Sequence, residues 1–468
     1  MKRKGLSLVM AGALLAGALA GCSTSSPSAS TPDATSTSPV SSSTPAEPVK
    51  LTLWHSMTDD AGPLIDGFVR DFNAGIGKEK GIEVEAIFQG SYSDATTKLR
   101  AILQNDQKDQ LPDVMQIDST GIVDYMSTDY SYTVDEALAD DPDYDLDGLL
   151  EVPLVNWNYN GVQLGMPFSS STTVLYYNKT MLEAAGFKSA PTTFQGIIDI
   201  AAKLPKQNAV GAAVSAYAGV PNSPSLANWI GQMPGTSTDA SYLVDSKNGR
   251  AGAVTKLVCD GEGTLLTFLT EWKKMYDAGA VLNQSDGLSD MFIAGQLAFL
   301  SASSSNLNTL LTSVGENFEI GSAYLPRVDD KSNYGATVSG SGMFMFDKGD
   351  DAQKAASWEF TKYLLSADVQ AAFSTGTGYF PSTKAAFETD TYKTYAAKNP
   401  QFEIAVKQVN ETSPDMLGIT IGPSWDFYME IQNQTSAMLD SGTDPAAAAT
   451  EMASVLNGIL EQYNRSNG

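Results

Sequence analysis

The chain has few of the residues from which most catalytic and metal sites are built. Its 468 residues include two cysteines and one histidine. Cys22 and Cys259 are too few for a disulfide framework or a thiolate metal cluster. The single histidine, His55, excludes a multi-histidine metal site, and any catalytic triad would have to use it. The sequence therefore predicts no cofactor and no metal site.

Positive charge is also scarce. Lysine and arginine total 29 residues against 54 aspartates and glutamates, which gives a formal net charge of −25. An acidic surface repels phosphate backbones, so nucleic acid is not an expected partner. After the first 21 residues the chain has no further uncharged apolar stretch of the length that spans a membrane.

The N-terminal end has the pattern of a secretory signal. Residues 1–21 begin with three basic residues, continue with an apolar run and end on small residues, as a cleavable signal peptide does. Leu-Ala-Gly-Cys over residues 19–22 resembles the bacterial lipobox, in which Cys22 would carry the lipid. The alternative is an ordinary signal followed by an unrelated cysteine. Residues 22–49 are mostly Ser, Thr, Pro and Ala, which predicts a disordered tether.

The rest of the chain alternates between strand and helix patterns. Leu64, Phe68 and Phe72 share one helical face, whereas the residues before and after them alternate polar with apolar side chains, as strands do. The predicted order is strand, helix, strand, helix, strand over residues 49–54, 63–72, 81–88, 93–103 and 111–117. This order and the absence of a long linker predict an α/β fold of two lobes joined by several crossings.

Several segments resemble one known family. The most specific is Pro-Phe-Ser-Ser-Ser-Thr-Thr-Val-Leu-Tyr-Tyr-Asn-Lys over residues 167–179. Further matches lie, in the expected order, at residues 53–57, 90–92, 292–303 and 377–382. The sequence is similar to the type 1 extracellular solute-binding proteins of carbohydrate ABC importers, and within them to the sn-glycerol-3-phosphate-binding branch.

The resemblance implies a periplasmic-binding-protein-like fold of type II, with two lobes joined by crossing hinge strands. It predicts a first lobe of residues 50–168 plus 304–342. It predicts a second lobe of residues 169–303 plus 343–468. The predicted crossings are residues 169–173, 298–303 and 342–346. Closure of such lobes around a ligand gives an importer a distinct state to recognise.

The resemblance also implies a set of ligand contacts, which are predominantly hydroxyl groups and aromatic rings. These are Tyr92, Ser171, Ser303, Gly340 and Tyr379. Asp118 stands where the branch has a glutamate, and Tyr428 where it has an arginine for the ligand phosphate. Hydroxyls beside rings suit a small polyol, whereas the loss of the arginine argues against a phosphate ligand. Each of these residues has a plain structural alternative, and Gly340 in particular could serve only a tight crossing.

These features imply a function in uptake. The chain is expected to capture a small hydroxylated solute, a sugar or polyol derivative, and to deliver it to the permease subunits of an ABC importer. It would act as a monomer on the extracytoplasmic face of the cell membrane, anchored to lipid through Cys22. The first alternative is a protein that binds sn-glycerol-3-phosphate or a glycerophosphodiester.

The alternative from a different class is a secreted glycoside hydrolase. Asp59, Asp60, Glu83 and Asp118 could supply a carboxylate pair for such an enzyme, although no catalytic residue is predicted. Asp143, Asp145 and Asp147 match the first half of a calcium-binding loop, but Leu154 occupies the position of its essential glutamate. A solvated acidic loop is the other interpretation of that segment.

Overall fold

The computed structural model describes residues 47–467 apart from positions 59, 120 and 235–239. The predicted signal sequence, Cys22 and all of the predicted tether before residue 47 lie outside the described residues, as does Asp59. Among the helices described, none combines the length and the apolar character that a membrane span requires.

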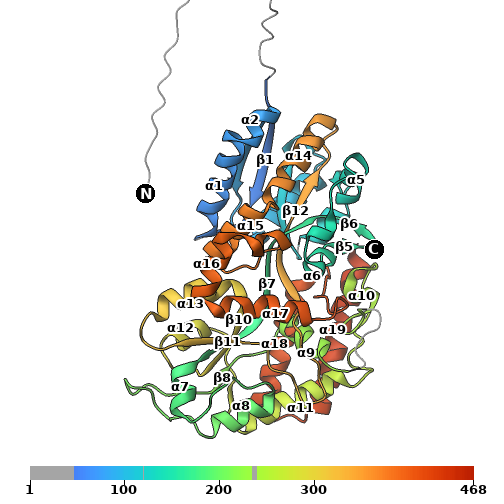
Figure 1. Ribbon diagram of the computed structural model, residues 1–468. Helices are drawn as coiled ribbons and strands as arrows, with labels where there is room; N and C mark the ends of the chain where they lie inside the picture. Colours follow the sequence, from blue (N-terminus) through green and yellow to red (C-terminus); the bar gives the residue numbers. More distant parts are fainter. Residues whose placement is uncertain (1–46, 59, 120, 235–239, 468) are drawn as a thin grey trace, which may run out of the picture. The chain divides into compact units, whose positions relative to one another are not determined.

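An eight-stranded sheet runs through the described part of the chain (Figure 1). Its main path has the order β10-β7-β12-β3-β1-β2, with β11 beside β7 and β4 beside β12. The strands are β1 (Val49–His55), β2 (Ile82–Phe88), β3 (Val114–Asp118), β4 (Ser131–Tyr132), β7 (Met166–Asn178), β10 (Phe299–Ser303), β11 (Ile320–Ala323) and β12 (Val338–Phe346). β1 is parallel to β2 and β3, whereas β12 and β7 are antiparallel. Two small sheets pair β5 (Asn158–Tyr159) with β6 (Val162–Gln163), and β8 (Tyr217–Ala218) with β9 (Val281–Leu282).

The predicted alternation of strands and helices over residues 49–117 is confirmed. The helix after β1 buries Ile65, Phe68 and Phe72 against the sheet, because residues three and four apart share one face. Leu64 lies at the margin of that face and is half-buried.

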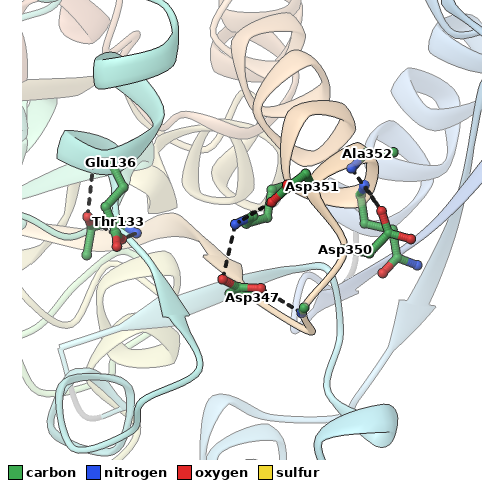
Figure 2. A network of polar contacts seen from close by, with 9 residues as sticks. Thr133, Glu136, Asp347, Asp350, Asp351 and Ala352 are labelled. Atoms are coloured by element: carbon green, nitrogen blue, oxygen red, sulfur yellow. Dashed lines mark hydrogen bonds and ion pairs between the residues drawn. The ribbon is translucent and has the colours of Figure 1, made fainter.

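One set of helices packs with the parallel strands, in what we call the first lobe. They are α1 (Ala61–Ala74), α2 (Ile76–Lys80), α3 (Tyr92–Gln104), α4 (Ile122–Met126), α5 (Val134–Asp140), α14 (Asp351–Leu364) and α15 (Ala367–Thr377). Side chains fix two of their N-terminal ends (Figure 2). The Asp350 carboxylate accepts from the Ala352 N–H at 2.8 Å, and Thr133 and Glu136 form a reciprocal cap on α5. Such caps replace the missing intrahelical partners of the first turn.

The second lobe holds most of the remaining helices. They are α7 (Lys179–Ala184), α8 (Phe194–Ala201), α9 (Ser223–Gly231), α10 (Asp245–Gly249), α11 (Thr264–Asp277), α12 (Leu288–Ile293), α13 (Leu307–Val314), α16 (Asp390–Lys398), α17 (Glu403–Glu411), α18 (Ser424–Ser441) and α19 (Pro445–Asn467). α6 (Glu151–Val155) precedes the β5–β6 hairpin. The buried rings of Phe194, Trp229, Phe268 and Trp272 contact one another in the core of this lobe.

The hydrophobic cores divide the chain differently from the predicted boundaries. Residues 304–342 were expected in the first lobe, but Leu307, Leu310 and Ile320 pack with Tyr176 in the second. Residues 343–373 were expected in the second lobe, but Met343 and helix α14 pack with β1 in the first. Both placements were wrong, because β12 carries the chain back to the first lobe before α14 begins.

Two strands contribute to the cores of both lobes. β7 buries Phe168 in the first lobe and Val174 in the second, which agrees with a crossing at residues 169–173. β12 crosses between Val338 and Met343, earlier than the predicted 342–346. The predicted crossing at 298–303 is wrong, because the helix that follows β10 still packs in the second lobe. The chain crosses instead after α15, near Phe380, whose N–H donates to the Ser170 carbonyl at 2.9 Å.

Candidate functional site

A seam of buried hydroxyl groups lies where β7 and β12 cross between the lobes. The Ser169 and Ser341 hydroxyls are 2.5 Å apart, and the Ser170 and Ser382 hydroxyls are 2.7 Å apart. The Gln116 side chain extends the seam by donating to Ser341 at 2.7 Å. Buried hydroxyl groups need hydrogen-bond partners. Because these hydroxyls bond to one another, the polar segment is well ordered.

Tyr92 begins α3 at the end of the sheet where β1, β2 and β3 finish. The turn before it is set by Ser91, whose hydroxyl accepts from the Asp94 N–H at 3.2 Å while the Asp94 carboxylate accepts from the Ser91 N–H at 2.9 Å. This reciprocal cap holds the first residue of the helix in place. Tyr92 therefore extends from a rigid position at the edge of the first lobe.

The Tyr92 hydroxyl lies close to two other predicted contacts. Burial raises its pKa, and neighbouring Tyr379 and Asp118 also raise it, whereas the nearby hydroxyls of Ser341 and Ser169 lower it. The phenol therefore stays protonated at neutral pH, so it can donate a hydrogen bond. Asp118 ends β3 and pairs in register with Ser341 on β12.

Tyr379 and Ser303 meet through Ser305. The Tyr379 ring stacks on Phe373 with centroids 5.5 Å apart. Burial raises the pKa of its hydroxyl, and a hydrogen bond with Ser305 opposes that shift. The Ser303 and Ser305 hydroxyls are 2.8 Å apart. The structure thus brings Tyr92, Asp118, Tyr379 and Ser303 into one polar group at the crossing.

Ser171 occupies the middle of β7, opposite Ser339 on β12. Its side chain is buried, and the alternation of a strand places it on the same face as Ser169 and Thr173. Thr173 in turn pairs in register with Ser303 and lines a cavity in the second lobe. Ser171 therefore lies between the Tyr92 group and that cavity.

The cavity has a volume of about 310 Å³. Polar side chains that line it are those of Thr173, Asn222, Ser225, Asn228, Ser285, Ser301 and Gln432, and the rings are those of Tyr217, Trp229, Trp272 and Tyr428. None of the described residues around it carries a carboxylate, an ammonium or a guanidinium group. Rings and neutral hydrogen-bonding groups are the usual lining of a site for a small uncharged molecule.

The polar residues of the cavity are held in fixed orientations. The Asn228 amide oxygen accepts from the Thr337 N–H at 2.7 Å and from its hydroxyl at 2.8 Å, and the amide nitrogen donates to Thr173 at 3.3 Å. Burial raises the pKa of Tyr217 to about 12, and a hydrogen bond with Ser301 opposes the shift. The indole N–H of Trp272 has no partner among the described residues.

Tyr428 is the one predicted contact that comes from α18, and it lines the cavity. Its ring stacks on Trp425 with centroids 5.1 Å apart and planes inclined by 7°. Trp425 is 68% exposed, which is unusual for so large a ring. The sequence interpretation missed Trp425, although its spacing of three residues from Tyr428 on one helix could have indicated it. It also missed the contribution of α9 and α11.

Two of the carboxylates considered for a hydrolase, Glu83 and Asp118, do not lie side by side. Glu83 lies at the start of β2, opposite Lys50, whereas Asp118 is the last residue of β3 and so lies at the opposite end of these parallel strands. The two carboxylates of a glycosidase lie within about 10 Å of each other. In the acidic loop, the Asp145 side chain accepts from the Asp147 N–H at 2.8 Å and caps a turn. The described residues hold no cluster of His, Cys, Asp and Glu that could bind a metal.

Comparison with known families decides the class of protein. A family model for the bacterial extracellular solute-binding protein matches residues 68–401. The chain belongs to this family. The sn-glycerol-3-phosphate-binding periplasmic protein UgpB of Yersinia pestis is 24% identical over 430 residues, covering 89% of this chain and 94% of the relative. UgpB of Escherichia coli O1:K1 is 24% identical over 426 residues, covering 89% and 93%.

Solved structures of this extracellular solute-binding family share the fold. The GacH receptor of Streptomyces glaucescens, solved free and with acarbose, has a TM-score of 0.68 at 18% identity, covering 88% of this chain and 99% of that one. UgpB of Mycobacterium tuberculosis with glycerophosphocholine has a TM-score of 0.68 at 20% identity, with coverage of 88% and 99%. The sugar-binding protein MalE of Xanthomonas citri has a TM-score of 0.71 at 20% identity, with coverage of 89% and 98%. These structures confirm the predicted two-lobed α/β fold. The family match confirms the prediction of an extracytoplasmic solute-binding protein.

A substitution at Gly340 tests the geometry of the crossing directly. Its φ is +111°, and a Cβ there would lie 1.7 Å from the Ser169 carbonyl oxygen. Gly442, which ends α18 with φ +67°, has no atom within 4 Å of such a Cβ. Both changes to alanine incur the cost of a left-handed conformation, about 1–2 kcal/mol.

We therefore expect Gly340→Ala to lower the free energy of unfolding by at least about 2 kcal/mol more than Gly442→Ala does, since it also forces β7 and β12 apart. Urea denaturation of the two variants measures the difference. Equal losses would show that the close approach of the two strands is not required.

Proposed function

We propose that this protein is the substrate-binding lipoprotein of an ABC importer and that its ligand is an uncharged sugar or polyol derivative. The observation that carries the proposal is the second-lobe cavity, which is lined by four rings and by neutral hydroxyl and amide groups. Flat rings contact the carbon-bound hydrogens of a sugar, and the amides and hydroxyls bond its hydroxyl groups. The ligand would bind without turnover and pass to the permease.

The ligand contacts in this proposal come from both lobes. Tyr92 and Asp118 would act from the first lobe, Ser171 and Tyr379 from the crossing, and Ser303 from the end of β10 in the second lobe. Tyr428 and Trp425 would form the wall of the second lobe. A protonated Tyr92 beside a carboxylate offers a ligand hydroxyl both a donor and a charged acceptor, and bonds to charged groups are the stronger kind. Gly340 would contribute backbone only.

A second candidate is a glycerophosphate or glycerophosphodiester. The names of the UgpB relatives favour it, but the distribution of arginine does not. The chain has six arginines, and none of the five that the structure describes lines the cavity. Arg100 is paired with Asp124 at 2.9 Å, and Arg250 and Arg327 donate to backbone carbonyls. Tyr428 can stack on a sugar ring but cannot neutralise a dianion.

Calorimetry should therefore show a neutral saccharide or polyol binding with micromolar or better affinity, about −8 kcal/mol or more favourable. sn-Glycerol-3-phosphate should bind at least about tenfold more weakly. Tyr428→Ala and Trp425→Ala should each weaken the neutral ligand, by about 1 kcal/mol for the lost ring contact, while Tyr428→Arg should improve the phosphorylated one.

Tyr334→Ala is a suitable control for these measurements, because it removes a ring from the second lobe that is 37% exposed and does not line the cavity. It should leave the affinity unchanged. Submicromolar binding of sn-glycerol-3-phosphate by the unaltered protein would overturn the proposal. The search for a phosphate site would then turn to Lys98, whose Nζ lies 4.0 Å from the Trp54 ring centroid.

The proposal includes a lipid anchor at Cys22, which is supported by the Leu-Ala-Gly-Cys sequence and the Ser/Thr/Pro segment that follows it. An acyl chain on Cys22 would hold the protein at the membrane. Cys22→Ser should move the protein from the membrane fraction to the soluble or secreted fraction. Cys259→Ser is the matched control, because Cys259 is buried in the second lobe, and it should not alter the distribution. A Cys22→Ser variant that stays in the membrane fraction would exclude this anchor.

A further inference from the structure

Arg250 is a buried cation without a carboxylate partner among the described residues. It is 5% exposed and follows α10 in the second lobe. Its Nη2 donates to the Asn156 Oδ1 at 2.8 Å, its Nη1 donates to the Gly418 carbonyl, and its guanidinium carbon lies 5.3 Å from the Tyr159 ring centroid. A buried guanidinium keeps its charge, so these contacts must compensate for lost water.

These contacts join the two lobes. Tyr159 and Trp157 belong to a hydrophobic core of the first lobe, whereas the segment around Arg250 packs in the core of the second. The Asn160 N–H donates to the Arg250 carbonyl at 2.7 Å, and the Tyr159 hydroxyl is 2.6 Å from the Thr420 hydroxyl. In Figure 1, α10 and the β5–β6 hairpin lie side by side at the edge of the protein, away from the crossing strands.

The backbone before Arg250 is strained. Ser246, Lys247 and Asn248 have φ between 53° and 54°, so three successive residues with side chains form a left-handed turn. Such residues persist only where surrounding contacts hold them. Asn248 supplies these contacts, since its Oδ1 accepts from the Leu243 N–H at 3.1 Å and its Nδ2 donates to the Leu417 carbonyl at 3.0 Å. The turn thus directs Arg250 toward the first lobe.

A cavity lies beside these contacts. Its volume is about 300 Å³, and it is lined by Val123 and Met126 from the first lobe and by Ile421 and Tyr463 from the second. The hydrogen bonds around Arg250 lie beside this cavity and contribute polar contacts to the attachment of the lobes. Water can replace those bonds when the lobes separate, which makes the attachment reversible.

The attachment lies on the flank of the candidate site. Val123 follows Asp118 by five residues, and Thr420 precedes Trp425 by five. We propose that Arg250, Asn156, Tyr159 and Thr420 form a latch that holds the lobes in the arrangement of this structure and opens when they move apart. The latch shifts the balance between two lobe arrangements and so sets the binding-competent fraction. It does not depend on which molecule the cavity takes.

The test measures the distance between the lobes in the absence of ligand. Spin labels at the exposed positions Gln104 on α3 and Thr270 on α11 report it by pulsed electron resonance, in the full chain carrying Cys22→Ser. Cys259 is buried, so it stays unlabelled. Arg250→Met should lengthen and broaden the distance distribution. It should also weaken binding of whichever saccharide or polyol binds the parent, about tenfold, with faster dissociation.

Arg327→Met is the matched control. Arg327 also lies over a tyrosine ring, 4.6 Å from the Tyr334 centroid, and it also donates to backbone carbonyls, but all these partners belong to residues 330–334 of the same lobe. The distance distribution of the Arg327→Met variant should equal that of the parent protein. Tyr159→Phe removes only the hydroxyl bonded to Thr420. It should lengthen the distance between the labels as Arg250→Met does, but by less. If Arg250→Met does not fold, the distance in Tyr159→Phe tests the latch instead.

Unchanged distances in folded Arg250→Met, or in Tyr159→Phe where only that variant folds, would overturn the latch. A shorter distance would overturn it too, since the contacts would then hold the lobes apart. Because this distance is read without ligand, failure of the latch and failure of the proposed solute binding give separate results.

Discussion

The close pairing of β7 with β12 is the constraint on which the rest of the structure depends. These two strands contribute to the cores of both lobes, and at Gly340 they approach too closely for any side chain. Buried hydroxyls of Ser169 and Ser341 satisfy each other across the pair. A polar seam that is fully hydrogen-bonded is rigid, so the crossing strands are the fixed element beside which Tyr92 of the first lobe and the cavity of the second lobe lie.

Charge is distributed in a way that suits a neutral ligand. The chain as a whole is strongly acidic, with a formal net charge of −25, yet the described lining of the cavity is uncharged. One of the proposed contacts is itself a carboxylate, Asp118 at the end of β3, beside Tyr92. A dianionic ligand would face this carboxylate without a guanidinium to balance it, whereas a sugar hydroxyl would donate to it. Specificity would then come from ring contacts and hydrogen-bond geometry rather than from charge.

The sequence predicted local structure well because its signals are local. The apolar spacing of Phe68 and Phe72 and the β-branched run of β7 are both borne out as elements. The predicted lobe boundaries were wrong because a strand pattern in the sequence does not indicate where along its length β12 passes from one hydrophobic core to the other. The cavity was largely missed because Trp229, Trp272 and Tyr428 are brought together around it only by the packing of three helices. Residues predicted from the family resemblance, such as Tyr92 and Tyr379, lie together in the structure, but their contact with a ligand stays a prediction.

Lobe closure on a ligand that is not altered is the central claim, and small-angle scattering tests it most directly. A thermal-shift panel of sugars, polyols and glycerophosphodiesters first selects the ligand, because specific binding raises the apparent stability. At saturating ligand, the account predicts a smaller radius of gyration than without ligand and recovery of the ligand intact. An unchanged radius of gyration, or release of a cleaved product, would contradict it.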